Sequence, residues 1–178
     1  MTNSHNQPFV NPRVLKVNVG FLLVQGAGHQ KSFELDLPRV RLEEDLDLDY
    51  VRGELRLSRN SRGILVQGGL ETSVVGECVR CLTPTAVPVT FELEELFAYP
   101  PSAEAEYAVD DTGILDLGPL LREEAILALP IGVLCRPDCA GLCPECGQNL
   151  NEGTCNCELD IDPRMESLRS YFNEDEET

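Results

Sequence analysis

Eight cysteines in three clusters constrain this chain more than any other feature of its sequence. The clusters read Cys78-Val-Arg-Cys81, then Cys135-Arg-Pro-Asp-Cys139-Ala-Gly-Leu-Cys143-Pro-Glu-Cys146, and finally Cys155-Asn-Cys157. Two thiolates separated by two residues can reach the same ion, and zinc takes four ligands in tetrahedral geometry. Eight thiols at these spacings therefore predict one Zn²⁺ site and allow a second.

The sequence leaves the pairing of these thiols open. The most local arrangement joins the pair in residues 143–146 to the pair in 155–157, closing a small loop through 149–153. The pair in 78–81 would then share a second ion with the pair in 135–139. An alternative combines 78–81 with 143–146, and four thiolates also suit an iron–sulfur cluster.

The cellular location bears on what these thiols do. No apolar run is long enough to cross a bilayer, and the polar start, Met1 to Pro8, does not resemble a signal peptide. A cytoplasmic, reducing location is expected, where cysteines bind metals or do redox chemistry. Cys78 and Cys81 are an alternative redox pair, although thioredoxin-like sites need this motif at a helix N-terminus and here it follows a predicted strand.

Charge is distributed unevenly along the chain. The net charge is −17. Residues 1–62 carry nine basic and eight acidic residues, whereas residues 63–178 carry five basic and 23 acidic residues. So acidic a protein cannot hold RNA through a general attraction to phosphate, and direct contact would need a local basic patch. Five arginines are the candidate RNA-binding residues. They are Arg52, Arg56, Arg59, Arg62 and Arg80.

Alternating apolar residues predict an antiparallel sheet. Three strands are expected at roughly 50–58, 63–78 and 86–97, joined as a meander, with two further strands at roughly 14–24 and 32–37. A helix is expected from about Pro119 to about Leu129, capped by Asp116 or Gly118. A second, short helix is expected after Asp162 and Pro163. Its apolar residues at helical spacing are Met165, Leu168, Tyr171 and Phe172.

The predicted fold class is α+β. An antiparallel sheet, which can curl toward a barrel, combines with the mid-chain helix, a cysteine-rich zinc loop and the short C-terminal helix. The expected organisation is a flexible arm (1–12), a core of sheet and helix (13–134), the zinc loop with the C-terminal helix (135–172) and an acidic tail (173–178).

Four segments, taken in order, resemble the YceD family. They are Gly76-Glu-Cys-Val-Arg-Cys-Leu82, Leu121-Arg-Glu-Glu-Ala-Ile-Leu-Ala-Leu-Pro130, Cys135-Arg-Pro-Asp-Cys-Ala-Gly-Leu-Cys-Pro-Glu-Cys-Gly147 and Ile161-Asp-Pro-Arg-Met-Glu-Ser-Leu168. The resemblance implies an accessory protein for the synthesis, processing or stability of large-subunit ribosomal RNA, with no catalytic activity. Family members differ in their number of cysteines, which makes zinc a stabilising feature rather than the shared activity.

Three functions follow as hypotheses. The first is a ribosome-biogenesis factor that binds ribosomal RNA or, because opposite charges attract, a basic ribosomal or processing protein. The second is a zinc-stabilised interaction module whose partner is unrelated to ribosomes. The third is a thiol redox protein that uses Cys78 and Cys81. No small-molecule substrate is inferred.

Overall fold

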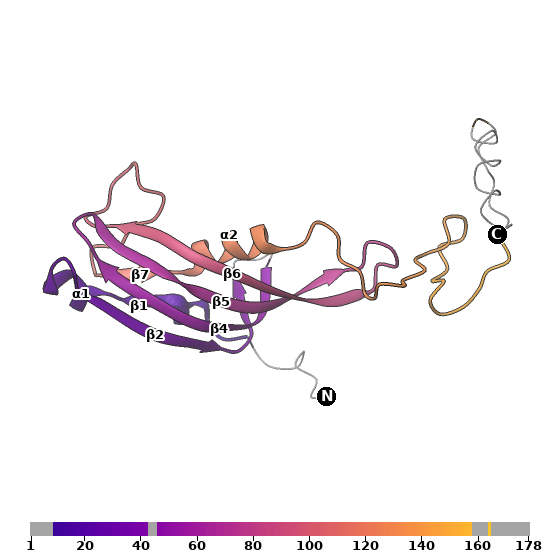
Figure 1. Cartoon of the computed structure of the whole chain (residues 1–178), viewed down its shortest axis with the longest axis horizontal. Helices are drawn as coiled ribbons and strands as arrows, with labels where there is room; N and C mark the ends of the chain where they lie inside the picture. Colours follow the sequence, from indigo (N-terminus) through magenta and orange to yellow (C-terminus); the bar gives the residue numbers. More distant parts are fainter. Residues whose placement is uncertain (1–8, 43–45, 158–163, 165–178) are drawn as a thin grey trace, which may run out of the picture.

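The fold is built on four long antiparallel strands. A computed structural model describes residues 9–42, 46–157 and 164 of the chain. The strands are hydrogen-bonded in the order β2, β4, β5 and β6 (Figure 1). Their bounds are β2 Gln30–Leu37, β4 Leu46–Arg59, β5 Gly63–Glu77 and β6 Pro84–Ala98. The predicted three-strand meander is confirmed, and β4 and β6 extend beyond the predicted ranges.

One face of this sheet forms the hydrophobic core. Successive side chains of a strand point to opposite faces, so every second residue turns inward. Leu55 and Leu57 of β4, Ile64 and Val66 of β5, and Leu93 of β6 are buried in this way. Burying each such side chain contributes about 1.5–3 kcal/mol. The inward face of the sheet therefore stabilises the fold without help from the cysteines.

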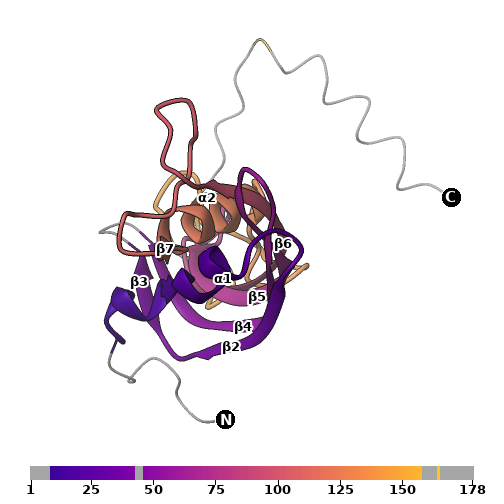
Figure 2. The ribbon, with the colours of Figure 1, turned by 90° about the vertical axis from the view of Figure 1, so that its left-hand side faces the viewer.

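A mid-chain helix covers this inner face. Helix α2, Gly118–Ala128, begins one residue before the predicted range and buries Leu120, Leu121 and Ala125. The side chain of Asp116 accepts a hydrogen bond from the Gly118 amide at 2.9 Å, which fixes the entry of the chain into the helix. Seen end-on, the sheet curves around α2 and leaves its other face bare (Figure 2).

Two glycines let the sheet bend. Gly53 on β4 and Gly68 on β5 have φ angles of 146° and 154°. A Cβ atom on either residue would lie 2.1 Å from a carbonyl oxygen of the neighbouring strand, so only glycine fits. The bend does not close the sheet. Within the described part of the chain β2 and β6 remain separate edges, so the expected curl does not produce a barrel.

The N-terminal segment differs from the prediction. The expected strand over residues 14–24 is wrong, because the buried side chains there are Leu15, Val19 and Leu22, at helical rather than alternating spacing. The segment contains a 3₁₀ helix (Pro12–Leu15), strand β1 (Lys16–Asn18) and helix α1 (Gly20–Gln25). Strand β1 pairs with β7, Ile114–Asp116, in a separate two-stranded sheet.

The remaining segments frame the sheet. Strand β3, Val40–Leu42, pairs with β4, and the Val10 amide donates to the Arg39 carbonyl, so the chain lies beside β3 at residue 10. Residues 1–8 of the expected arm, the expected C-terminal helix except Arg164, and the acidic tail lie outside the described residues. No helix in the described ranges is long and apolar enough to cross a membrane.

Candidate metal centres

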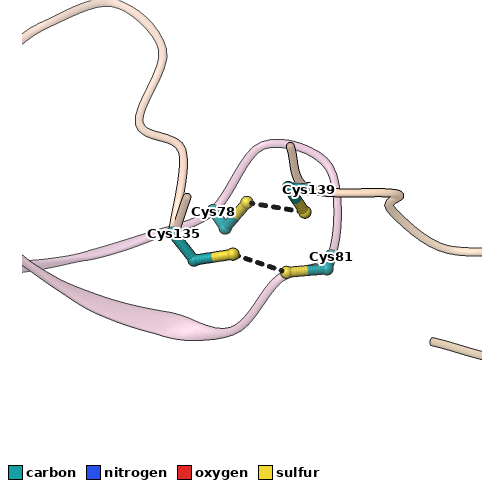
Figure 3. A group of neighbouring side chains, drawn as sticks. All are labelled: Cys78, Cys81, Cys135 and Cys139. Atoms are coloured by element: carbon teal, nitrogen blue, oxygen red, sulfur yellow. Dashed lines mark hydrogen bonds between the residues drawn. The ribbon is translucent and has the colours of Figure 1, made fainter. Parts of the chain in front are cut away.

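Four sulfurs meet where the β5–β6 hairpin turns. Cys78 follows β5 and Cys81 lies in the turn before β6, whereas Cys135 and Cys139 belong to the segment after α2. The Sγ atoms of Cys78 and Cys139 are 3.8 Å apart, and those of Cys81 and Cys135 are 3.6 Å apart (Figure 3). All four sulfurs lie within 4.8 Å of one another. We call them the first cluster.

Backbone hydrogen bonds shape the turn that holds Cys78 and Cys81. The Leu82 amide donates to the Cys78 carbonyl at 2.8 Å, and the Cys78 amide donates to the Thr83 carbonyl at 3.0 Å. Leu82 has a φ of 58°, a left-handed conformation that costs a non-glycine residue roughly 1–2 kcal/mol. An ion bound by both cysteines would offset this cost, because the turn brings the two sulfurs to one side.

A second set of sulfurs gathers further along the chain. The second cluster is Cys143, Cys146, Cys155 and Cys157, whose sulfurs also lie within 4.8 Å of one another. The Gly147 amide donates to the Cys143 carbonyl at 2.9 Å, and Gly147 has a φ of 72°, which favours glycine. Cys143 is buried, whereas Cys146 and Cys157 are exposed. The second cluster is therefore the more accessible of the two.

The geometry of the clusters fits zinc. Zinc–thiolate bonds measure about 2.3 Å, so sulfurs at the corners of a tetrahedron lie about 3.8 Å apart. The two distances in the first cluster, 3.6 and 3.8 Å, match that edge. Sulfurs this close surround a single ion, which favours zinc over a cluster of several irons. Of the two pairings left open by the sequence, the structure has the more local one.

The thiols within each cluster differ in acidity. Backbone amides, with that of Cys135 foremost, lower the pKa of Cys78 to about 6, and the Cys146 amide leads those that lower the pKa of Cys143 to about 7. Burial raises the pKa of Cys135 to about 12, and a hydrogen bond with Cys146 raises that of Cys157 to about 12. A bound cation must displace protons from the weaker acids, so metal affinity falls as pH falls.

Asn151 connects the two clusters. It lies in the loop between the two cysteine pairs of the second cluster, yet its Nδ2 donates to the Sγ of Cys139 at 3.4 Å. Its Oδ1 accepts from the Ala140 amide at 2.8 Å and from the Arg136 guanidinium at 2.6 Å. A residue in the loop of the second cluster thus orients a sulfur of the first. No sequence signal marks Asn151, because nothing in its spacing relates it to residue 139.

Arg80, one of the five candidate RNA-binding residues, belongs to this region. Its Nη1 donates to the Cys139 carbonyl at 2.9 Å, and its own carbonyl accepts from the Leu142 amide at 3.0 Å. The residue between the two cysteines of the hairpin therefore holds the segment that carries the other half of the first cluster. Arg80 therefore has a structural role in holding this segment, which the sequence pattern did not indicate.

The other four arginines do not join Arg80. Arg59 and Arg62 lie at the opposite end of β5, a strand of 15 residues. At about 3.3 Å per residue, that end of the strand is on the order of 45 Å from Arg80. Arg52 and Arg56 lie between the two ends on β4, so the structure spreads the five candidates along the sheet instead of gathering them.

Comparison with known proteins identifies the family. The sequence model of the family described as large ribosomal RNA subunit accumulation protein YceD matches residues 66–170, which include β5, β6 and both clusters. The chain belongs to the YceD family. Uncharacterized proteins of Mycobacterium tuberculosis (strain ATCC 25618 / H37Rv) and Mycobacterium bovis are 40% identical to this YceD-family chain over 141 residues. No solved structure matches it.

The chain spans less than two thirds of the length of these relatives. The alignment with the two proteins above covers 75% of this YceD-family chain and 65% of theirs. An uncharacterized protein of Mycobacterium leprae is 39% identical over 103 residues, which cover 54% of this chain and 48% of that protein. The relatives carry no established activity in their names, so the family description is the functional information that the comparisons supply.

The two clusters of this YceD-family protein should respond differently to loss of a ligand. Cys146→Ser should release the ion of the exposed second cluster and loosen residues 143–157, while the sheet, whose core is aliphatic, stays folded. Cys81→Ser should release the whole 135–157 segment, because it breaks the link between that segment and the hairpin. Limited proteolysis with mass spectrometry distinguishes the two patterns. Equal loss of protease resistance in the sheet for both variants would contradict this account.

Removing the side chain of Asn151 should weaken zinc binding at the first cluster. Asn151→Ala deletes the hydrogen bond to Cys139 and leaves all eight thiols in place. Contacts that orient a ligand are typically worth about tenfold or more in metal affinity. Competition with a chromogenic chelator measures the change. Asn156→Ala, at an exposed position within the second cluster, is the matched control, and equal zinc affinity in the two variants would show that Asn151 has no such role.

Proposed function

We propose that this protein is a non-catalytic accessory factor that promotes the accumulation of large-subunit ribosomal RNA. The observation that supports it most directly is the match to a family described by that role, across the strands and both cysteine clusters. The zinc ions would hold the C-terminal segment on the sheet, and the protein would act by binding. A basic protein on the path of ribosome assembly is the partner that the described surface favours.

The burial of the first cluster supports binding over thiol chemistry. A redox pair must present a thiolate to another sulfur, and reactivity depends on access as well as acidity. The Cys78 side chain is 0% exposed and that of Cys81 is 6% exposed. Their sulfurs face two further thiols instead of an open surface. A structural ion bound by all four thiolates would account for this arrangement, whereas the redox hypothesis assigns no role to Cys135 and Cys139.

The contacts of the arginines favour a protein partner over RNA. Arg52 forms an ion pair with Asp36 at 2.9 Å, and Arg56 donates to Gln67 at 2.9 Å. Arg59 donates to the Gly63 carbonyl at 2.9 Å and so stabilises the β4–β5 turn. Guanidinium groups already bound to neighbouring side chains or backbone are poorly placed to form a phosphate-binding patch on a protein of net charge −17.

Exposed apolar side chains beside the first cluster favour a second candidate function. Val79 is 60% exposed, Leu82 is 59% exposed and Ile131 is fully exposed. The Val79 amide donates to the Val133 carbonyl, which places the segment that carries Ile131 beside the hairpin turn. Apolar side chains grouped on a surface are typical of protein contacts. A zinc-stabilised interaction module with a partner unrelated to ribosomes would use this surface as well.

Loss of the protein should lower the amount of large-subunit ribosomal RNA relative to small-subunit RNA. Deleting the gene in the host cell and restoring either the wild-type chain or Cys81→Ser, which disrupts the first cluster, gives the comparison. Wild type should restore the ratio and Cys81→Ser should not, because the 135–157 segment would no longer be held. Ribosomal RNA quantification provides the readout. An unchanged ratio in the deletion strain would refute the proposed function.

Crosslinking identifies the class of partner in the same cells. Ultraviolet crosslinking followed by denaturing purification should recover little RNA, because four of the five candidate arginines have partners within the protein. Lysine-reactive crosslinking should instead recover basic proteins of the large subunit or of its processing enzymes. Specific enrichment of one region of large-subunit RNA would show direct RNA binding and would contradict the preference for a protein partner.

A further inference from the structure

The outer face of the large sheet carries no covering element among the described residues. Helices α1 and α2 lie on the concave side, and the opposite side of β2, β4, β5 and β6 is bare (Figure 2). Long surfaces of this kind on a regulatory protein are available to a partner. The chemistry of the face follows from the register of the strands, which places residues from all four strands in rows across it.

One row consists of three glutamates and a glycine. Glu34 of β2 lies directly opposite Glu54 of β4, Glu54 lies opposite Gly69 of β5, and Gly69 lies opposite Glu92 of β6. Like charges placed directly opposite each other destabilise a sheet. None of the three carboxylates forms a hydrogen bond or ion pair with the described residues, whereas many neighbouring polar groups do. The negative charge of this row is therefore not offset by an ion pair within the described residues.

The glycine leaves a hollow within this row. Strands lie about 4.8 Å apart, so the Cα atoms of Glu54 and Glu92 lie about 10 Å from each other on either side of Gly69. A Cβ atom at Gly69 would lie 2.8 Å from Oε1 of Glu92, so the Glu92 carboxylate reaches over Gly69 and would have to move to admit a side chain there. The hollow beside it measures about 610 Å³, and its lining includes Glu54, Glu92, Glu94 and Arg56. Its size is sufficient for the end of a long side chain.

The two arginines of this region offset only part of its negative charge, and Arg56 itself lines the hollow. Over residues 34–36 of β2, 52–56 of β4, 67–71 of β5 and 90–94 of β6, the outer face carries six acidic residues and two basic ones. Arg52 is paired with Asp36, at the side of the hollow away from Glu94, and Arg56 is bonded to Gln67. The acidic residues are Glu34, Asp36, Glu54, Glu71, Glu92 and Glu94. Two of the five residues first considered for RNA binding thus lie on a surface whose net charge repels phosphate.

We propose that this face binds an extended, basic polypeptide segment, with a lysine or arginine side chain of the partner inserted over Gly69 between Glu54 and Glu92. The proposal rests on the proposed function and specifies its interaction surface. An extended segment places every second side chain on one side, so successive cations can meet successive rows of the sheet. Charge complementarity would steer the partner and fix its register on the strands.

Binding of a basic peptide to the purified, zinc-loaded protein tests the proposal. The probe is a fluorescein-labelled peptide of alternating lysine and threonine, and fluorescence anisotropy reports its affinity. The double variant Glu54→Gln/Glu92→Gln should bind about tenfold more weakly than wild type, because two carboxylate contacts are lost. It should melt no earlier than wild type, since the substitution removes like-charge repulsion in the row.

A matched double variant separates the site from overall charge. Glu104→Gln/Glu106→Gln removes the same two charges from exposed positions in the loop after β6 and should bind the peptide like wild type. Equal weakening in both double variants would overturn the proposal, because binding would then follow net charge alone. A single-stranded RNA of similar length is the competitor in the same assay. Displacement of the peptide by this RNA, and loss of that displacement in Arg52→Ala/Arg56→Ala, would overturn the proposal and indicate an RNA-binding surface instead.

Ribosomal RNA levels in cells distinguish failure of this proposal from failure of the proposed function. Glu54→Gln/Glu92→Gln should fail to restore the large-subunit to small-subunit RNA ratio in the deletion strain, whereas the loop variant should restore it. If deletion lowers the ratio and both variants restore it fully, the proposed binding surface would be refuted while the proposed function would stand. An unaffected ratio in the deletion strain would remove the function on which the surface rests.

Discussion

The convergence of four sulfurs at the β5–β6 turn is the constraint on which the placement of residues 135–157 depends. Cys78 and Cys81 come from a rigid hairpin, and Cys135 and Cys139 come from a segment with few apolar side chains to bury. The small cluster of buried residues here consists of cysteines with Leu142 packed against them. Four thiolates this close would repel one another, and a cation bound at their centre would remove that repulsion. The segment of the second cluster then attaches to the first through the Leu142 amide, which donates to the Arg80 carbonyl, and through Asn151.

The sheet is stabilised by a different interaction, the burial of apolar side chains. Its stability comes from aliphatic side chains on β4, β5 and β6 packed against α2, and no cysteine contributes to that core. Glycines at positions 53 and 68 allow close approach of neighbouring strands, and Gly69 leaves room for the Glu92 carboxylate over the outer face. The protein therefore combines a platform with an apolar core and, at one end, a cysteine-rich extension whose two clusters could each bind a metal. This division suits the accessory factor proposed above, which would present surfaces to partners.

Much of this architecture follows from patterns of residues. Alternation identified the three strands of the meander, because each has one buried and one exposed face. The spacing of the cysteines predicted one metal site and allowed a second, and the structure supplies the pairing that the spacing left open. The same reasoning failed over residues 14–24, where Val17, Val19, Phe21 and Leu23 alternate by coincidence while the side chains actually buried follow a helical turn. Short segments of apolar residues fit either period, and only tertiary contacts decide between them.

Properties that depend on register could not be predicted. The sequence places Glu34, Glu54 and Glu92 far apart, and only the pairing of four strands aligns them in one row with Gly69. The same pairing separates Arg80 from Arg59 by the length of β5, although the sequence suggests one basic group. Asn151 is a comparable case, since its contact with Cys139 arises from folding of the zinc loop rather than from any motif.

Native mass spectrometry of the purified, fully reduced protein tests the central claim most directly. The two sets of four neighbouring sulfurs predict a single dominant species that carries two zinc ions per chain, with all eight cysteines present and no disulfide. A dominant species with no metal, or one whose cysteines are joined as disulfides while the chain remains folded, would contradict the account, because no cation would then hold the C-terminal segment on the sheet.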